Sequence, residues 1–300
     1  LFELYSEKVK LYKEKENKKF VELKLKYGKK IKRKDIFKKT TELYNTAHKY
    51  GATILRRYPN TKYKAAIYYT LALNSRDFAY DKRELNYLRL AIDNSNGQEN
   101  VNYLARTSLA EYYYNNKNWK SAIYQYKLVI DNKDDEWYSK NLLNYGWCLL
   151  KTHEFDGAIN NLEKSFKLSS DDFYVNVQDQ AMTGLISFYV LGKQIDRGIA
   201  FINKYQIPKE KNESLLKLAQ KSAGKGFYAE AQKIVLSLEK TVDHIKEVEL
   251  YADLRLFQFD LYNQYHKSDK LLNIAKILAQ TKMSEYQQEE AVRKISDVVG

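Results

Sequence analysis

One stretch, VNYLARTSLAEYYYNNKNWKSAIYQYKLVID at residues 101–131, is enough to work out how this chain folds. In its second half, apolar residues stand 3, 4, 7, 10 and 11 positions after Trp119, which is the spacing of one helix face. Its first half carries another apolar stripe, and the polar run at residues 115–118 separates the two. The stretch therefore predicts two helices joined by a tight turn. Because neither helix can bury its stripe alone, copies of the unit are expected on both sides.

Such copies recur along the chain. Ala122 is a small residue at a position where two helix backbones would meet. This position recurs at intervals of 37, 38, 36, 40, 33 and 40 residues. The residues there are Ala47, Glu84, Ala122, Ala158, Gly198, Ala231 and Leu271. Small residues also recur twelve positions earlier, at Ala72, Ala110, Gly146 and Ala219. The larger Glu84 and Leu271, and Ile186 in the earlier position, depart from this rule, so we expect sheared or loosened packing in those copies.

This pattern resembles the tetratricopeptide (TPR) repeat, whose consensus has small residues at both positions and an aromatic residue just before the second. The resemblance covers roughly residues 41–280. It implies an all-α fold, a right-handed α-solenoid of about six helix-turn-helix pairs closed by a capping helix. Residues 1–40 are expected to form a basic amphipathic helical segment, and residues 41–300 the repeat array. The alternative is a helical bundle whose spacings agree by chance.

Composition supports a nearly all-helical chain, since 44% of its 300 residues are hydrophobic and it has only 2 Pro and 11 Gly. No apolar run approaches the ~20 residues of a membrane span, which predicts a soluble chain. The net charge of +13 is uneven: residues 1–40 hold 15 Lys and Arg against 6 Asp and Glu, and the remaining 260 hold 36 against 32. The basic character therefore belongs to one end.

The densest basic run lies at residues 27–39, YGKKIKRKDIFKK. Clustered Lys and Arg release counterions from polyanions, so this run is a candidate anion-binding segment for lipid headgroups, lipopolysaccharide or nucleic acid. The candidate residues are Lys29, Lys30, Lys32, Arg33 and Lys34. The alternative is a solvated helix junction in a lysine-rich protein.

A shorter resemblance begins at Tyr58-Pro59-Asn60-Thr61 and continues through Tyr63 to Leu71. It is similar to a junction found in TPR proteins of the bacterial cell envelope, such as the BamD-like outer-membrane assembly lipoproteins and the Tol-Pal coordinator family. It implies a periplasmic or outer-membrane-associated protein, with the cytoplasm as the alternative. Because the sequence starts at Leu1 without a Met or a signal-like segment, we expect upstream sequence to have been removed.

Catalytic motifs are missing from the sequence. The four histidines, His48, His153, His244 and His266, stand far apart with no second ligand at metal spacing. No glycine-rich phosphate loop occurs, and Cys148 has no histidine near it in sequence. We therefore expect no enzyme activity, no cofactor, no metal and no small-molecule substrate.

The TPR resemblance implies a groove lined by the first helix of each pair. Counting from the small positions gives these candidate partner-binding residues: Thr107, Glu111, Tyr114, Lys140, Leu143, Asn144, Trp147, Lys151, Gln180, Thr183 and Ser187. A clamp for an acidic chaperone tail is disfavoured, since only Lys140 and Asn144 match its Lys and Asn set and Glu111 would repel such a tail. Trp147 has an alternative role, packing against the neighbouring repeat.

Together these patterns predict a non-enzymatic scaffold that binds a partner protein or peptide within a cell-envelope assembly. The rival hypothesis is a polyanion-binding module that acts through the basic segment on a membrane surface or, less expectedly, on nucleic acid. The partner's identity, the oligomeric state and the presence of a lipid anchor do not follow from the sequence.

Overall fold

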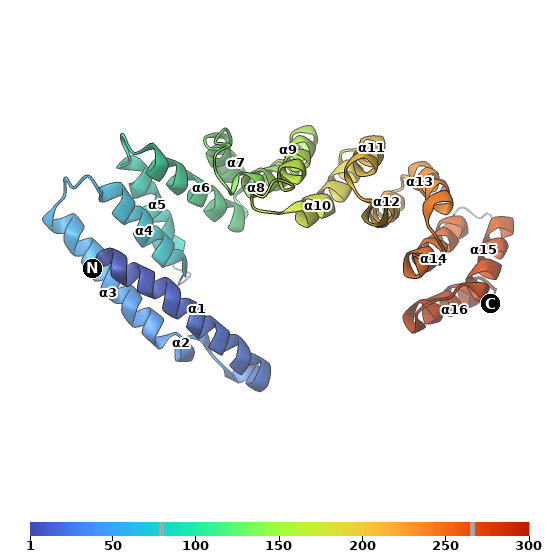
Figure 1. Cartoon of the computed structure of the whole chain (residues 1–300), viewed down its shortest axis with the longest axis horizontal. Helices are drawn as coiled ribbons and strands as arrows, with labels where there is room; N and C mark the ends of the chain where they lie inside the picture. Colours follow the sequence, from blue (N-terminus) through green and yellow to red (C-terminus); the bar gives the residue numbers. More distant parts are fainter. Residues whose placement is uncertain (78–80, 265–267, 300) are drawn as a thin grey trace. The chain divides into compact units, whose positions relative to one another are not determined.

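Helices account for all regular structure in the described residues, which are 1–77, 81–264 and 268–299 of the computed structural model (Figure 1). The chain divides into two units, residues 1–133 and 134–300, and each is treated separately below. The first unit contains α1 (Phe2–Tyr27), the 3₁₀ helix η1 (Gly28–Lys30), α2 (Arg33–Ile36), α3 (Lys38–Arg57), α4 (Lys64–Asp77), α5 (Asp81–Asp93), α6 (Glu99–Asn115) and α7 (Trp119–Lys127).

The second unit begins with α8 (Tyr138–Lys151), α9 (Phe155–Leu168), α10 (Gln178–Leu191) and α11 (Ile195–Tyr205). It continues with α12 (Pro208–Ala223), α13 (Tyr228–Thr241), α14 (Val248–Gln264), α15 (Ser268–Gln280) and α16 (Glu285–Val299). Each odd-numbered helix from α9 to α15 folds back on the helix before it, so the unit is a series of hairpins followed by α16. This arrangement is the one that the repeat pattern predicts.

Within the second unit, the hairpins stack in two layers. The first helices contact one another in sequence, α8 with α10, α10 with α12, α12 with α14 and α14 with α16. The second helices α9, α11, α13 and α15 form the other layer. The first unit repeats this plan with α1, α4 and α6 as first helices, paired with α3, α5 and α7. Stacking of this kind buries each amphipathic face on a neighbour, as α-solenoids do.

The basic N-terminal segment is the first helix of a hairpin of its own. Its residues Phe2 and Val9 are buried, Phe2 beside Ile67 and Leu71 and Val9 beside Leu43 and Tyr44. The array therefore contains one pair more than the six expected. The functional division after residue 40 remains a prediction.

All seven small-residue positions lie on second helices and are buried. Their partners on first helices, including Ala72, Ala110 and Ala219, are fully buried as well. The helices approach one another most closely around Leu162 of α9. The two methyl groups of Leu162 occupy the space that side chains at Gly146 of α8 and Gly184 of α10 would need. A Cβ at these glycines would stand 2.2 and 2.7 Å from Leu162. Only glycine admits this packing of one leucine between two helices.

The turns inside the hairpins repeat one backbone conformation. Lys117, His153, Lys193 and Gly226 all have positive φ, between 56° and 84°. In each turn the next residue donates its N–H to the carbonyl five positions earlier, at 2.7 to 2.9 Å, which satisfies a carbonyl at the end of the first helix. Three of these four left-handed positions hold a non-glycine residue, so a glycine signals the positive φ in the sequence only at Gly226.

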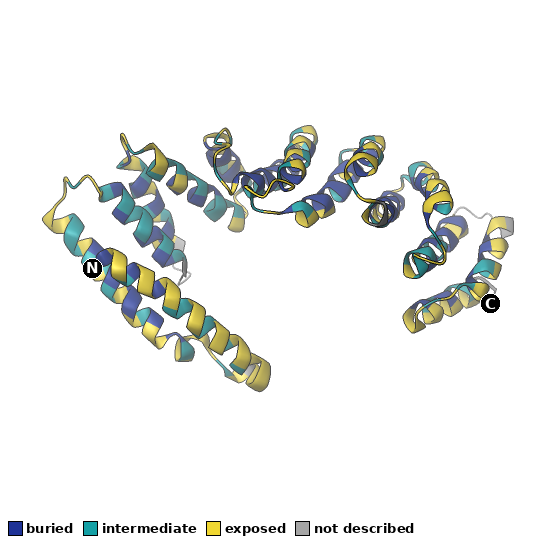
Figure 2. Cartoon of the chain, in the orientation of Figure 1, coloured by how far each residue is buried: buried dark blue, intermediate teal, exposed yellow. Residues whose placement is uncertain are grey.

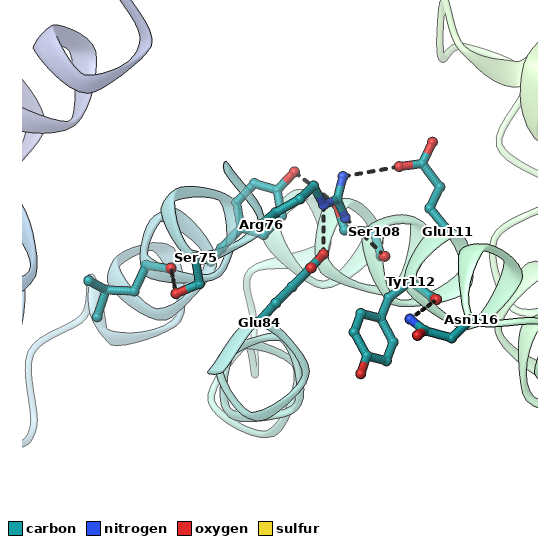
Figure 3. Close-up of polar contacts among 9 residues, drawn as sticks. Ser75, Arg76, Glu84, Ser108, Glu111, Tyr112 and Asn116 are labelled. Carbon is teal, nitrogen blue, oxygen red and sulfur yellow. Dashed lines mark hydrogen bonds and ion pairs between the residues drawn. The ribbon is translucent and has the colours of Figure 1, made fainter. Parts of the chain in front are cut away.

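The buried Glu84 does not loosen its hairpin, contrary to expectation. Arg76 of α4 donates from Nε to Glu84 Oε1 at 2.6 Å, and from its two Nη atoms to Glu111 Oε2 at 3.2 Å and the Ser108 carbonyl at 3.1 Å (Figure 3). One guanidinium thus ties α4, α5 and α6 together. The expected loosening is wrong, since α4 and α5 stay closely packed and the charge of the large residue is compensated by a buried ion pair.

Candidate partner-binding surfaces

The outward face of the first-helix layer in the second unit holds most of the predicted groove residues. On α8 these are Lys140, Asn144, Trp147 and Lys151, spaced by 4, 3 and 4 residues along one side of the helix. Lys151 is exposed, and Lys140 and Asn144 are partly exposed. The Lys140 ammonium lies 4.9 Å from the centroid of the Trp137 ring, which places a cation beside an exposed aromatic surface.

Two α8 residues are less available than the groove prediction implies. Leu143 is buried, so it is not available to a partner and the expectation of an apolar anchor there is wrong. Trp147 is half-buried, with its ring edge-on to Phe188 of α10 at a centroid distance of 4.8 Å. The structure therefore matches the alternative in which Trp147 packs against the neighbouring repeat.

On α10 the predicted residues lie where the helix is open to solvent. Gln180 and Thr183 are exposed, and Ser187 is half-buried, one turn beyond Thr183. The helices α8 and α10 contact each other, and their predicted polar residues Lys140, Asn144, Gln180 and Thr183 are all at least partly exposed. We call these four residues the α8–α10 surface. Its side chains can donate and accept hydrogen bonds to an extended chain.

In the first unit, α6 carries Thr107, Glu111 and Tyr114, all partly buried. Glu111 accepts from Arg76, and the Tyr114 ring lies edge-on to Trp119 at 5.7 Å. The Thr107 hydroxyl is buried and has no hydrogen-bond partner among the described residues. Glu111 and Tyr114 thus have roles inside the fold, and a binding role for the three residues remains a prediction.

Sequence reasoning missed a pocket of about 450 Å³ on the first-helix layer of the second unit. It is lined by Gln220 and Ala223 of α12, by Asp253, Leu256, Phe257, Asp260 and Leu261 of α14, and by Glu290 of α16. The signal was present in the sequence: Asp253, Phe257, Asp260 and Gln264 recur at spacings of 4, 3 and 4 along α14. We call this site the α12–α16 pocket.

Charge in the α12–α16 pocket is predominantly negative. Lys294 Nζ lies 2.6 Å from Asp260 Oδ1 and 3.3 Å from Glu290 Oε1. Burial opposes charging of Lys294, but these carboxylates raise its pKa, so it stays a cation. Gln287 donates to Asp253 Oδ1 at 2.7 Å. Three lining carboxylates against one ammonium leave an excess of negative charge, which favours a positively charged side chain.

Of the five candidate anion-binding residues, the four that can be described are exposed, namely Lys30, Lys32, Arg33 and Lys34. The Lys29 side chain lies outside the described residues. The Arg33 guanidinium stacks over the Phe37 ring, with 4.4 Å from its central carbon to the ring centroid. These cations face solvent at the end of α1, and anion binding by them remains a prediction.

Two groups with potential chemistry, Cys148 and His48, are held in packed surroundings. Burial raises the pKa of the Cys148 thiol to about 12, which keeps it protonated and unreactive. His48 Nε2 lies 2.7 Å from the Tyr87 hydroxyl, and burial lowers the pKa of His48. His266 lies outside the described residues. Within the described ranges, His, Cys, Asp and Glu form no group suited to a metal ion.

None of the described helices combines the length and apolar character needed to cross a membrane.

No protein-family model matches the sequence, and no curated protein matches it. Among solved structures, the Naa15/Naa10 complex bound to HypK-THB gives a TM-score of 0.52 at 13% identity. That match covers 85% of this chain, which spans only 37% of the matched chain. A tetratricopeptide repeat protein from Parabacteroides merdae gives a TM-score of 0.45 at 14% identity, covering 85% of this chain and 93% of that one. The apo form of RapI gives 0.44 at 13%, covering 97% and 99%.

At such identities a likeness shows the fold alone. It agrees with the repeated hairpins, the buried small residues and the shared turn conformation. The chain is therefore an all-α protein of stacked helical hairpins, and its fold class is an α-solenoid with TPR-like repeats.

Proposed function

We propose that this protein is a non-enzymatic scaffold that binds a partner polypeptide along the first-helix layer of its second unit. The observation that carries the proposal is the α12–α16 pocket, which is formed by first-layer helices and by none of the second-layer helices. The α8–α10 surface lies on helices of the same layer and adds hydrogen-bonding groups. Concave sites with a few polar groups beside apolar residues are where proteins hold ligands.

Both sites suit a polypeptide better than a small molecule. The pocket combines Phe257, Leu256 and Leu261 with carboxylates, so it can accept the alkyl stem and the charged end of a lysine or arginine. The α8–α10 surface offers amide, hydroxyl and ammonium groups without a deep cavity, which suits the backbone of an extended segment. Support also comes from the Naa15/Naa10 structure, which matches with a TM-score of 0.52 and is bound to HypK-THB.

Site-specific photo-crosslinking in cells tests the proposal. A photoreactive phenylalanine at Gln180, Thr183 or Gln264 is expected to capture the same partner protein from all three positions. The matched controls are Leu236 and Ser237, which are exposed on second-layer helix α13. Capture of the same protein with equal yield at the α13 positions would refute a binding surface on the first-helix layer.

We further propose that the scaffold works in a bacterial cell envelope. Support comes from the junction at residues 58–71, which is similar to that of envelope TPR proteins. The test is fractionation of cells that express the full natural gene product. Recovery with the periplasm or the outer membrane is expected, and recovery in the cytoplasm alone would refute this location.

A further inference from the structure

The α12–α16 pocket has a regular order of side chains along α14. Asp253, Phe257 and Asp260 are spaced by 4 and 3 residues, so they lie on one side of the helix. Asp253 is exposed, and Phe257 and Asp260 are half-buried, on a helix that combines such positions with buried ones (Figure 2). At a rise of ~1.5 Å per residue, the two aspartates stand roughly 10 Å apart along the helix axis, with the phenylalanine between them.

The end of the pocket at Asp260 already holds one cation and still keeps a negative charge. Lys294 Nζ of α16 lies 2.6 and 2.7 Å from the two carboxylate oxygens of Asp260 and 3.3 Å from Glu290 Oε1. Two carboxylates thus share one ammonium group, and one negative charge is left over. Because the Asp260 side chain is 44% exposed, a second cation can approach it.

The end of the pocket at Asp253 has no compensating cation. Its Oδ1 atom accepts a hydrogen bond from the neutral Gln287 amide at 2.7 Å. In the part of the chain that the structure describes, Lys294 is the only cation in an ion pair with a lining carboxylate, although Lys217 and Arg293 are exposed one turn from lining residues. Each end of the pocket therefore keeps a negative charge.

Two negative ends with an aromatic ring between them fit two basic side chains that flank an apolar one. A helix lying along α14 repeats the rises of Asp253, Phe257 and Asp260 with its own residues i, i+3 or i+4, and i+7. An extended chain does not, because its side chains on one face recur every ~6.6 Å, whereas the steps along α14 are ~6 and ~4.5 Å. Leu256 and Leu261 beside the ring extend the apolar contact.

We propose that the α12–α16 pocket binds a basic helical segment of the partner. Its lysine or arginine side chains meet Asp253 at one end and the Asp260–Glu290 pair at the other, and an apolar side chain between them packs on Phe257. This inference rests on the proposed function and names the kind of segment that the first-helix layer holds at this place. The proposed function itself needs only a partner on that layer, so it stands if the segment is of another kind.

Fluorescence anisotropy with the intact chain tests this inference. The probe is a fluorescein-labelled alanine–glutamine helix with arginines at i and i+7 and leucines at i+3 and i+4. A second peptide has the same composition, but one arginine is moved to the opposite side of the helix. The first peptide is expected to bind at least about tenfold more tightly, since only its arginines can reach both ends of the pocket together.

Variants of the pocket show whether the peptide binds there. Asp253→Asn keeps an acceptor for Gln287 but removes the charge, so affinity for the first peptide should fall about fivefold. Gln264 is an exposed lining residue one turn after Asp260, where Gln264→Lys should weaken binding and Gln264→Glu should strengthen it. The control is Asp196→Asn on second-layer helix α11, whose side chain is 77% exposed, and it should leave both affinities unchanged.

Circular dichroism verifies that each variant remains helical. Equal affinity for the two peptides overturns the inference, and so does an affinity that neither Asp253→Asn nor the Gln264 variants change. If the peptides bind alike while crosslinking from Gln180 and Thr183 still captures a partner, the basic helix is wrong and the proposed function stands. Equal capture at the α13 positions removes the proposed function, whatever the peptides show.

Discussion

Replacing Arg76 by Met removes the cation that joins three helices in the first unit. The Glu84 side chain is only 6% exposed, and Arg76 lies 2.6 Å from it. Breaking a buried ion pair from one side destabilises by ~3–5 kcal/mol, because a charge remains in a poorly solvated place. Arg76 itself is one-third exposed, so water can reach part of the site, and we expect about 3 kcal/mol.

A second substitution tests the reason for that loss. Glu84→Ala restores the small residue that the repeat pattern has elsewhere at this position. We expect the double variant, Arg76→Met with Glu84→Ala, to come within ~1 kcal/mol of the natural chain, because the buried charge has then gone with its partner. The double-mutant cycle should give a coupling of about 2 kcal/mol between the two residues.

Hydrogen exchange of backbone amides in α5 and α6, followed by mass spectrometry, measures the local stability of these helices. The matched control is Lys233→Met, which removes an ion pair of similar length, 2.7 Å to Asp196, with side chains that are 67% and 77% exposed. Exposed pairs contribute little, so less than ~0.5 kcal/mol is expected. If Arg76→Met changes stability as little as Lys233→Met does, burial of Glu84 is not what gives the ion pair its importance.

Four further measurements test the packing. Gly146→Ala should destabilise the second unit by about 2 kcal/mol in urea unfolding, since its methyl group would meet Leu162. The control is Gly157→Ala, whose methyl group would meet a single flexible methyl at 3.2 Å. It should change stability by less than ~1 kcal/mol. Trp147→Ala should lower the stability of the same unit by about 2–3 kcal/mol through lost contact with the next repeat, and no loss would favour a groove role instead. Lys193→Gly should stabilise by ~0.5–1 kcal/mol because its φ is 56°, and a loss of stability would contradict the assigned backbone conformation. His48 has a lowered pKa in the folded chain, so its contribution to stability is present above pH 6.5, the ordinary value, and is lost as pH falls below it. His48→Gln should flatten that pH dependence, and an unchanged dependence would exclude His48 as its source.

Part of the candidate site could be read from residue spacing, and part could not. Of the residues predicted from the spacing along α8 and α10, Gln180 and Thr183 are exposed and Lys140 and Asn144 are partly exposed, and their binding role stays a prediction. The spacing failed for Leu143, because a count from one small position defines a helix face only to within about one residue. The α12–α16 pocket was missed because its lining comes from three helices that are far apart in sequence.

The sequence by itself determined the fold class, since a recurring small residue beside apolar stripes with helical spacing has few physical solutions other than stacked hairpins. It also indicated that α1 is basic and amphipathic. Only the tertiary structure decided which face of α1 is buried, and that Arg76 compensates for Glu84. The reason is physical: local spacing sets the direction of side chains on one helix, whereas burial and charge pairing depend on which other helices come into contact.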